Sequence, residues 1–115
     1  MMMNTVNKNQ EICPIVETIK VIGGKWELTI IRYLSDRPMR FNELLRNAHG
    51  ISSRTLSRIL KILMEKGLVK RELISLQPVV VLYSLTESGS EIRPVIDALR
   101  KWGEKYITSG ENTIY

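Results

Sequence analysis

Apolar residues recur at helical spacing along most of the chain. Their pattern predicts helices at about residues 14–22, 25–34 and 52–66. The third of these carries apolar residues three and four positions apart, which form one continuous stripe: Leu56, Ile59, Leu60 and Leu63. A serine pair precedes this helix, and either Ser52 or Ser53 is expected to cap its first turn.

The remaining elements are shorter or less regular. An extended piece at 39–41 precedes a short helix, which Asn42 is expected to cap. Residues with branched side chains predict two strands, at 68–75 and 79–85, that form a hairpin. Pro94 lies within the pattern of the last helix and either kinks that helix or marks its start. The apolar side of this helix consists of Ile92, Val95, Ile96, Leu99, Trp102 and Tyr106.

The order of these elements indicates one fold class. It runs helix, helix, short strand, helix, turn, helix, hairpin and helix. Two helices joined by a short glycine-containing turn and followed by a hairpin are typical of a winged helix-turn-helix, so we expect an α+β, mostly helical fold. The 115 residues are enough for one domain. We place this domain at residues 12–107, between a flexible N-terminal tail at 1–11 and a C-terminal tail at 108–115.

Composition excludes several classes of protein. Apolar residues make up 43% of the chain and charged residues 25%, as in ordinary globular domains. No apolar run approaches the roughly 18 residues of a membrane span, and the polar N-terminus does not resemble a signal peptide. The single cysteine allows no internal disulfide and fits a reducing, cytoplasmic environment. With one cysteine, one histidine and no catalytic motif, we expect no enzyme activity, no metal site and no cofactor.

Basic residues are concentrated in the middle of the chain. Between residues 37 and 71 there are nine arginines and lysines against two acids, Glu43 and Glu65, in a chain of net charge +5. A basic segment between nearly neutral ends is the pattern expected of a face that binds a polyanion. The alternative is an ordinary solvated basic surface.

One side of the helix at 52–66 is almost free of acidic residues. The side chains that share this side, opposite the apolar stripe, are Arg54, Ser57, Arg58 and Lys61. Arginine can donate two hydrogen bonds to guanine in the major groove, and the free amides near Ser52 and Ser53 can bind phosphate. We interpret this side as a DNA-reading surface; the alternative is an ordinary exposed side. Flanking side chains that are expected to contact phosphate are Arg40, Asn42, Arg46, Lys70 and Arg71. The alternative for each of these is an ordinary solubilising side chain.

The closing helix carries a longer apolar stripe than a small core can cover. The first helix is its natural neighbour, and a second copy of the chain would cover both across a two-fold axis. The side chains expected in this homodimer interface are Ile15, Ile19, Ile96, Leu99, Trp102 and Tyr106. The alternative is that the closing helix folds back on its own domain.

The tip of the hairpin has no basic residue over 76–82. A wing that enters a minor groove normally carries arginine or lysine. Apolar residues on both strand faces indicate contact with a helix or a partner subunit. This observation keeps a second function open, that of a winged helix that contacts proteins without binding DNA specifically.

Cys13 directly precedes Pro14 at the expected start of the first helix. Backbone amides at a helix start can raise the reactivity of a thiol, so Cys13 is a candidate redox sensor. The alternative is a small packed side chain without a role.

Eight short segments, taken together and in order, resemble the HxlR-type winged helix-turn-helix transcriptional regulators. They are Cys13-Pro14, 22–26 (IGGKW), 40–44 (RFNEL), 50–52 (GIS), 67–69 (GLV), 83–86 (YSLT), Pro94-Val95 and Trp102-Gly103. The resemblance spans about residues 12–107, nearly the whole chain.

The resemblance implies a homodimeric regulator with a MarR-like fold that binds a palindromic operator in double-stranded DNA. The helix at 52–66 would be the recognition helix, and the first and last helices would form the dimer interface. Cys13 matches the cysteine through which some members sense electrophiles or oxidants, which implies a small-molecule or oxidant effector. Two positions depart from the family. Ser53 stands where a proline is common, and residues 78–80 (PVV) replace a basic wing turn.

Overall fold

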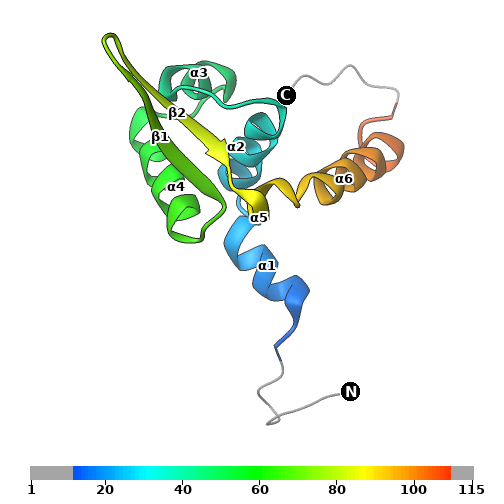
Figure 1. Cartoon of the computed structure of the whole chain (residues 1–115). Helices are drawn as coiled ribbons and strands as arrows, with labels where there is room; N and C mark the ends of the chain where they lie inside the picture. The colour runs from blue at the N-terminus through cyan, green and yellow to red at the C-terminus, as the bar shows by residue number, and fades with distance from the viewer. Residues whose placement is uncertain (1–11, 110–115) are drawn as a thin grey trace.

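The computed structural model describes residues 12–109, so the predicted tail at 1–11 and most of the tail at 108–115 lie outside the described residues. Its elements, in chain order, are α1 (Pro14–Ile22), α2 (Lys25–Asp36), α3 (Phe41–Asn47), α4 (Ser53–Glu65), β1 (Val69–Leu76), β2 (Val79–Leu85), α5 (Glu87–Ser90) and α6 (Arg93–Tyr106) (Figure 1). The α+β, mostly helical winged helix-turn-helix fold is thereby confirmed.

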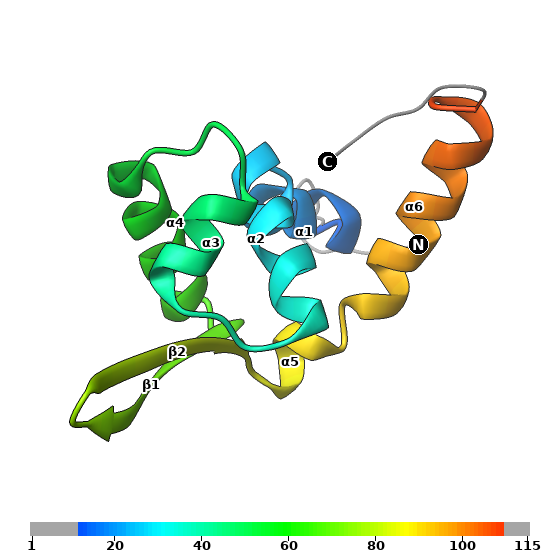
Figure 2. The same cartoon turned by 90° about the horizontal axis from the view of Figure 1, so that it is seen from above.

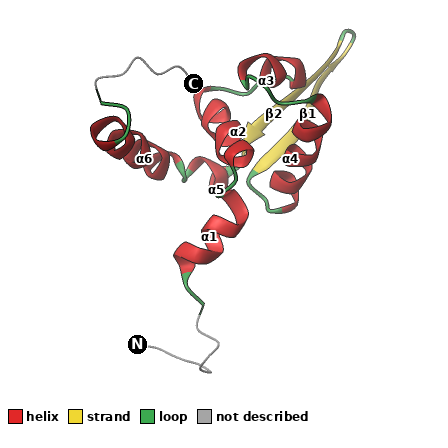
Figure 3. Ribbon diagram, turned by 180° about the vertical axis from the view of Figure 1, so that it is seen from behind, coloured by secondary structure: helices red, strands yellow, loops and turns green. Residues whose placement is uncertain are grey.

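The helices α2, α3 and α4 pack with the hairpin into one body, from which α1 and α6 extend (Figures 1 and 2). Seen from behind, the yellow hairpin projects on the side of this body opposite to α6 (Figure 3). The largest fully buried side chains come from α2, α3 and α4: Ile30, Ile31, Leu34, Leu44, Leu56, Ile59, Leu60 and Leu63. The apolar stripe predicted for α4 is therefore confirmed as its core side, which leaves its opposite side for solvent.

The starts of α3 and α4 are fixed by side chains in different ways. Ser52, the N-cap of α4, accepts a hydrogen bond on its Oγ from the backbone N–H of Thr55 at 3.0 Å. The prediction that Asn42 caps α3 is wrong, because Arg40 is the N-cap. Its backbone N–H donates to the carboxylate of Glu43 at 2.9 Å. A carboxylate in the first helical turn thus stabilises this helix start, and Asn42 lies within the turn.

The two strands pair antiparallel, from Val69 opposite Leu85 to Leu76 opposite Val79. β2 has the predicted bounds, whereas β1 starts and ends one residue later than predicted. The segment before α3 joins this sheet through Met39, whose backbone N–H donates to the Tyr83 carbonyl at 2.9 Å and whose carbonyl accepts from Tyr83 at 2.8 Å. This pairing holds the start of α3 beside β2 and confirms the predicted extended piece at Met39. The piece ends at Arg40 and not at residue 41 as predicted, because Phe41 is the first residue of α3.

A tight joint connects the end of α4 to α5. Gly67 has φ +76°, a backbone conformation that favours glycine. Its carbonyl oxygen accepts hydrogen bonds from the hydroxyls of Thr86 at 2.5 Å and Ser88 at 3.0 Å. A Cβ at Gly89 would overlap the backbone carbonyl oxygen of Leu68. The first residues of α5 are therefore held against the end of α4.

α6 begins at Arg93, with two residues between it and the end of α5, and Pro94 lies in its first turn. Proline is well tolerated there because the N–H it lacks would have no partner within the helix. Of the two alternatives that the sequence left open, the helix start at Pro94 is correct to within one residue and the kink is wrong. No helix within residues 12–109 has both the length and the apolar character needed to cross a bilayer.

Candidate nucleic-acid interface

The outer side of α4 is a continuous donor surface. Its side chains are all exposed: Arg54, Ser57, Arg58 and Lys61. The apolar side chains on the other side of the same helix are at most 1% exposed. Within residues 12–109, no carboxylate lies within 4.0 Å of these arginine and lysine nitrogens. The cations predicted to read DNA are therefore free of intramolecular acid partners in this part of the chain.

The two serines at the start of α4 differ in what their hydroxyls can do. Ser52 is occupied by capping, since its Oγ accepts from the Thr55 N–H and donates to Thr55 Oγ1 at 3.0 Å. Ser53 is the first residue of α4 and is exposed. Ser52 therefore orders the helix start, and Ser53 is the better placed of the two to contact a ligand with its hydroxyl.

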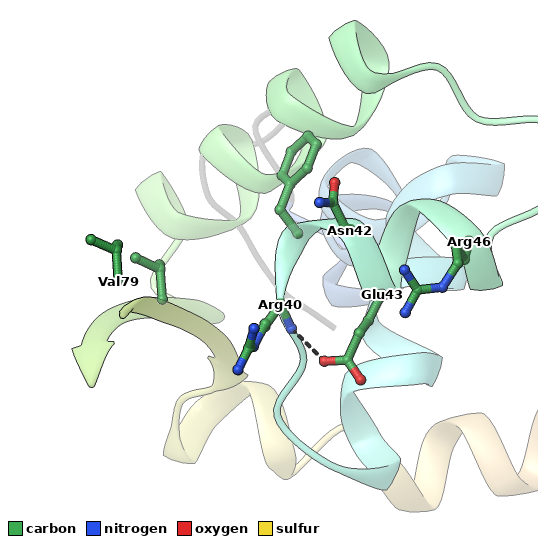
Figure 4. A pocket seen from close by; sticks show the side chains of 7 residues that line it. Arg40, Asn42, Glu43, Arg46 and Val79 are labelled. Atoms are coloured by element: carbon green, nitrogen blue, oxygen red, sulfur yellow. Dashed lines mark hydrogen bonds between the residues drawn. The ribbon is translucent and has the colours of Figure 1, made fainter. Parts of the chain in front are cut away.

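A hollow between α3 and β2 brings together side chains that are distant in the sequence (Figure 4). Its lining residues are Arg40, Phe41, Asn42, Glu43, Arg46, Val79 and Val81. Three predicted phosphate contacts, Arg40, Asn42 and Arg46, thus lie together here. The other two, Lys70 and Arg71, are exposed on β1 opposite Ser84 and Tyr83 and do not line the hollow.

Sequence reasoning missed Glu43 as part of this surface. One carboxylate oxygen accepts from the Arg40 N–H at 2.9 Å, and the other lies 3.1 Å from Nη1 of Arg37. The backbone hydrogen bond from Arg40 lowers the pKa of the Glu43 carboxyl, and the positive charges of Arg37 and Arg46 add to this against the effect of burial. The spacing of Glu43 three residues after the N-cap is the signal that could have identified it.

This lowered pKa predicts a pH dependence of stability. The pKa of this carboxyl is lower in the folded chain than its ordinary value of 4.5. The ionised carboxylate therefore stabilises the fold, and this stabilisation is fully present above pH 4.5. The stabilisation is lost as pH falls through the lowered pKa. We expect the melting temperature of Glu43→Gln to lie below that of the wild type by a constant amount between about pH 5 and 7 and to converge with it in more acidic buffer. A gap that persists unchanged at about pH 3 would contradict the assignment.

The terminal helices expose most of the side chains predicted for a dimer interface. Ile15 is 70% exposed, Ile19 59%, Leu99 51%, Trp102 58% and Tyr106 60%. Trp102 and Tyr106 lie against each other with ring centroids 5.3 Å apart. The prediction that Ile96 lies in the dimer interface is wrong, because Ile96 is 7% exposed and packs in the core of its own chain. It is therefore unavailable to a second chain, whereas the other five are accessible.

Cys13 is the N-cap residue of α1 and its thiol is free and exposed. Its carbonyl accepts the first hydrogen bond of the helix, from the N–H of Glu17 at 3.0 Å. The alternative of a small packed side chain is therefore not supported within the chain itself. In the described residues no group of three histidine, cysteine or acidic side chains could hold a metal ion.

Comparison with known proteins identifies the family. The HxlR-like helix-turn-helix profile matches residues 21–111. An HTH-type transcriptional regulator of Methanothermobacter thermautotrophicus is 36% identical over 105 residues, which cover 91% of this chain and 80% of that protein. Two solved structures align with a TM-score of 0.75. The redox regulator HypR in its oxidized form is 36% identical over 90% of this chain and 100% of its own. The reduced form of YodB from B. subtilis is 31% identical over 88% and 100%. The chain therefore belongs to the HxlR-like helix-turn-helix family of DNA-binding transcriptional regulators and is not an enzyme.

Proposed function

We propose that the protein binds a palindromic operator in double-stranded DNA as a homodimer, in the cytoplasm, with α4 in the major groove. The observation that carries this proposal is the exposed side of α4, where Arg54, Arg58 and Lys61 have no acidic partner among the described residues. In a dimer of this kind, the two recognition helices enter successive major grooves about 34 Å apart. Arg40, Asn42 and Arg71 would then position the protein on phosphates.

Exposed apolar side chains on the terminal helices support the homodimer. Single exposed apolar residues are ordinary, whereas a contiguous group of them marks an interaction site. Leu99, Trp102 and Tyr106 follow one another at helical spacing on α6 and are each at least half exposed. A second copy would cover the same helix on both chains, as two-fold symmetry requires.

Selection of bound fragments from genomic DNA with the purified protein tests this proposal. Fragments that share a two-fold motif, and that bind in gel shifts at physiological salt more tightly than random duplex, would support it. Affinity should fall steeply as salt rises, because each phosphate contact releases counterions. Equal weak affinity for all sequences would exclude specific operator binding.

The exposed wing tip favours a second candidate, a contact with another protein. Leu73, Ile74, Leu76 and Val79 are between 53% and 75% exposed, and the tip carries no cation. If this contact replaced specific DNA binding, the selection would return no motif. If it accompanied DNA binding, the motif would appear and the wing would still be free for a partner.

We also propose that an oxidant or a small electrophile regulates this protein through Cys13. HypR is described as a redox regulator, and YodB has been solved reduced, treated with diamide and bound to a quinone. In this chain Cys13 is the single cysteine and its thiol is exposed. A disulfide at this position must therefore form with another molecule, either a second copy or a small thiol.

Oxidation of the wild type with diamide is expected to change operator affinity by about tenfold or more, the range of typical allosteric coupling. A Cys13→Ser variant should bind the operator as the reduced wild type does and should not respond to diamide. Gel shifts and non-reducing electrophoresis of the same samples measure both effects. An equal response of wild type and variant would exclude the thiol as the sensor.

A further inference from the structure

Glu43 is the one acidic side chain among the described residues that line the hollow between α3 and β2. Figure 4 shows it between Arg40 and Arg46. A negative charge on a surface that binds a polyanion repels the ligand. The presence of Glu43 in this surface is therefore explained by a specific interaction and not by general solubility.

Both oxygens of this carboxylate are engaged within the protein. One oxygen accepts from the backbone N–H of Arg40 at 2.9 Å, which fixes the carboxylate at the start of α3. The other lies 3.1 Å from Nη1 of Arg37, and that nitrogen also donates to the Pro38 carbonyl at 3.3 Å. The side chain of Glu43 is only 26% exposed, so its pairing with Arg37 is shielded better than that of a fully exposed ion pair.

The pairing with Glu43 makes Arg37 different from most of the nearby basic residues, because its charge has an acidic partner. Of the nine basic residues at 37–71, Arg37 and Lys70 are the two with a carboxylate within 4.0 Å among the described residues. The guanidinium of Arg37 is not part of the lining of the hollow but lies 3.1 Å from the carboxylate of Glu43, which is. Without Glu43, this cation would be as available to phosphate as Arg40 and Arg46 are.

We propose that Glu43 is a positioning residue that holds Arg37 away from the DNA backbone and thereby weakens non-specific binding more than operator binding. The inference rests on the proposed function of operator recognition. Non-specific affinity comes almost entirely from phosphate neutralisation, so one withheld arginine per protomer lowers it directly. Operator affinity also includes contacts between α4 and base edges, which Glu43 does not touch. The effect is a higher ratio of specific to non-specific affinity.

The test compares Glu43→Gln with the wild type on random duplex and on the selected operator over a series of salt concentrations. Glutamine keeps an oxygen that can accept the Arg40 N–H and removes the charge that binds Arg37. We expect affinity for random duplex to rise about three- to tenfold, and the slope of log K against log salt to steepen by about 0.9 for each released arginine. The preference for operator over random duplex should fall.

Two further variants separate positioning from structure. Adding Arg37→Ala to Glu43→Gln should restore the wild-type salt slope, because the released cation is then absent. Glu43→Ala loses the hydrogen bond to Arg40 as well as the charge, so the difference between its melting temperature and that of Glu43→Gln reports the helix-start contribution. An unchanged slope in Glu43→Gln, or a steep slope that persists in the double variant, would overturn the inference. Operator preference of the wild type tests the proposed function separately, since slopes on random duplex can be measured whether or not that preference exists.

Discussion

Replacing Leu99 with glutamate is expected to make the protein monomeric and to weaken operator binding by about 100-fold or more, because two linked half-site contacts become independent. Leu99 is 51% exposed in the single chain, so a glutamate there stays hydrated and the domain still folds. In a dimer the same carboxylate would be taken out of water without a partner, at a cost of several kcal/mol. Light scattering measures the oligomeric state and gel shifts the affinity.

A matched control for this variant is Lys101→Glu. Lys101 is exposed and lies two positions along α6, about 200° around the helix from Leu99. The Lys101→Glu substitution introduces a carboxylate on the side of α6 that carries no apolar stripe, so the dimer should persist. A dimeric Leu99→Glu protein with wild-type affinity would remove α6 from the proposed interface.

Replacing Arg58 with alanine is expected to cost about 1–3 kcal/mol in operator binding, roughly 5- to 150-fold in affinity. Arg58 is exposed at the middle of the outer side of α4, and a guanidinium there can donate to both acceptors of a guanine. Because Ile59 and Leu60 hold the opposite side of the helix in the core, the fold should be unaffected. Sequence preference should relax at one base pair of each half-site.

Arg58→Lys is the control that distinguishes base reading from charge. Lysine keeps the positive charge but lacks the planar fork, so the salt dependence should stay close to wild type while discrimination at that base pair is lost. Selection experiments on randomised half-sites measure the discrimination. If Arg58→Ala binds the same sequences with the same affinity, Arg58 is not part of the readout.

Local patterns in the sequence predicted the secondary structure well where one side of an element is buried. The α4 stripe is an example, since Leu56, Ile59, Leu60 and Leu63 all lie in the core. The cap of α3 was mispredicted because asparagine is a common N-cap residue. The N-cap is instead Arg40, two positions before Asn42, where the carboxylate of Glu43 accepts the backbone N–H of Arg40. Ile96 shares its helical spacing with exposed neighbours, and only packing against the body distinguishes it.

The candidate site was predictable to the extent that it lies on one helix. Arg54 and Arg58 follow from helical spacing alone, and the structure finds both exposed. Predicting the hollow would have required knowing which strand lies beside α3. The backbone pairing of Met39 with Tyr83 places β2 there. A contact between residues so far apart in the chain leaves no periodic trace, so the proximity of Val79 to Arg40 could not be read from the sequence.

The joint at Gly67 has a mechanical consequence. The hydroxyls of Thr86 and Ser88 donate to the carbonyl of Gly67, just after α4, and only two residues separate α5 from α6. α4 and α6, the helix proposed to join the subunits, are therefore connected by a short and tightly held segment. In a dimer, a rotation of one subunit relative to the other would therefore change the distance between the two copies of α4. That distance would then match, or no longer match, the spacing of successive major grooves.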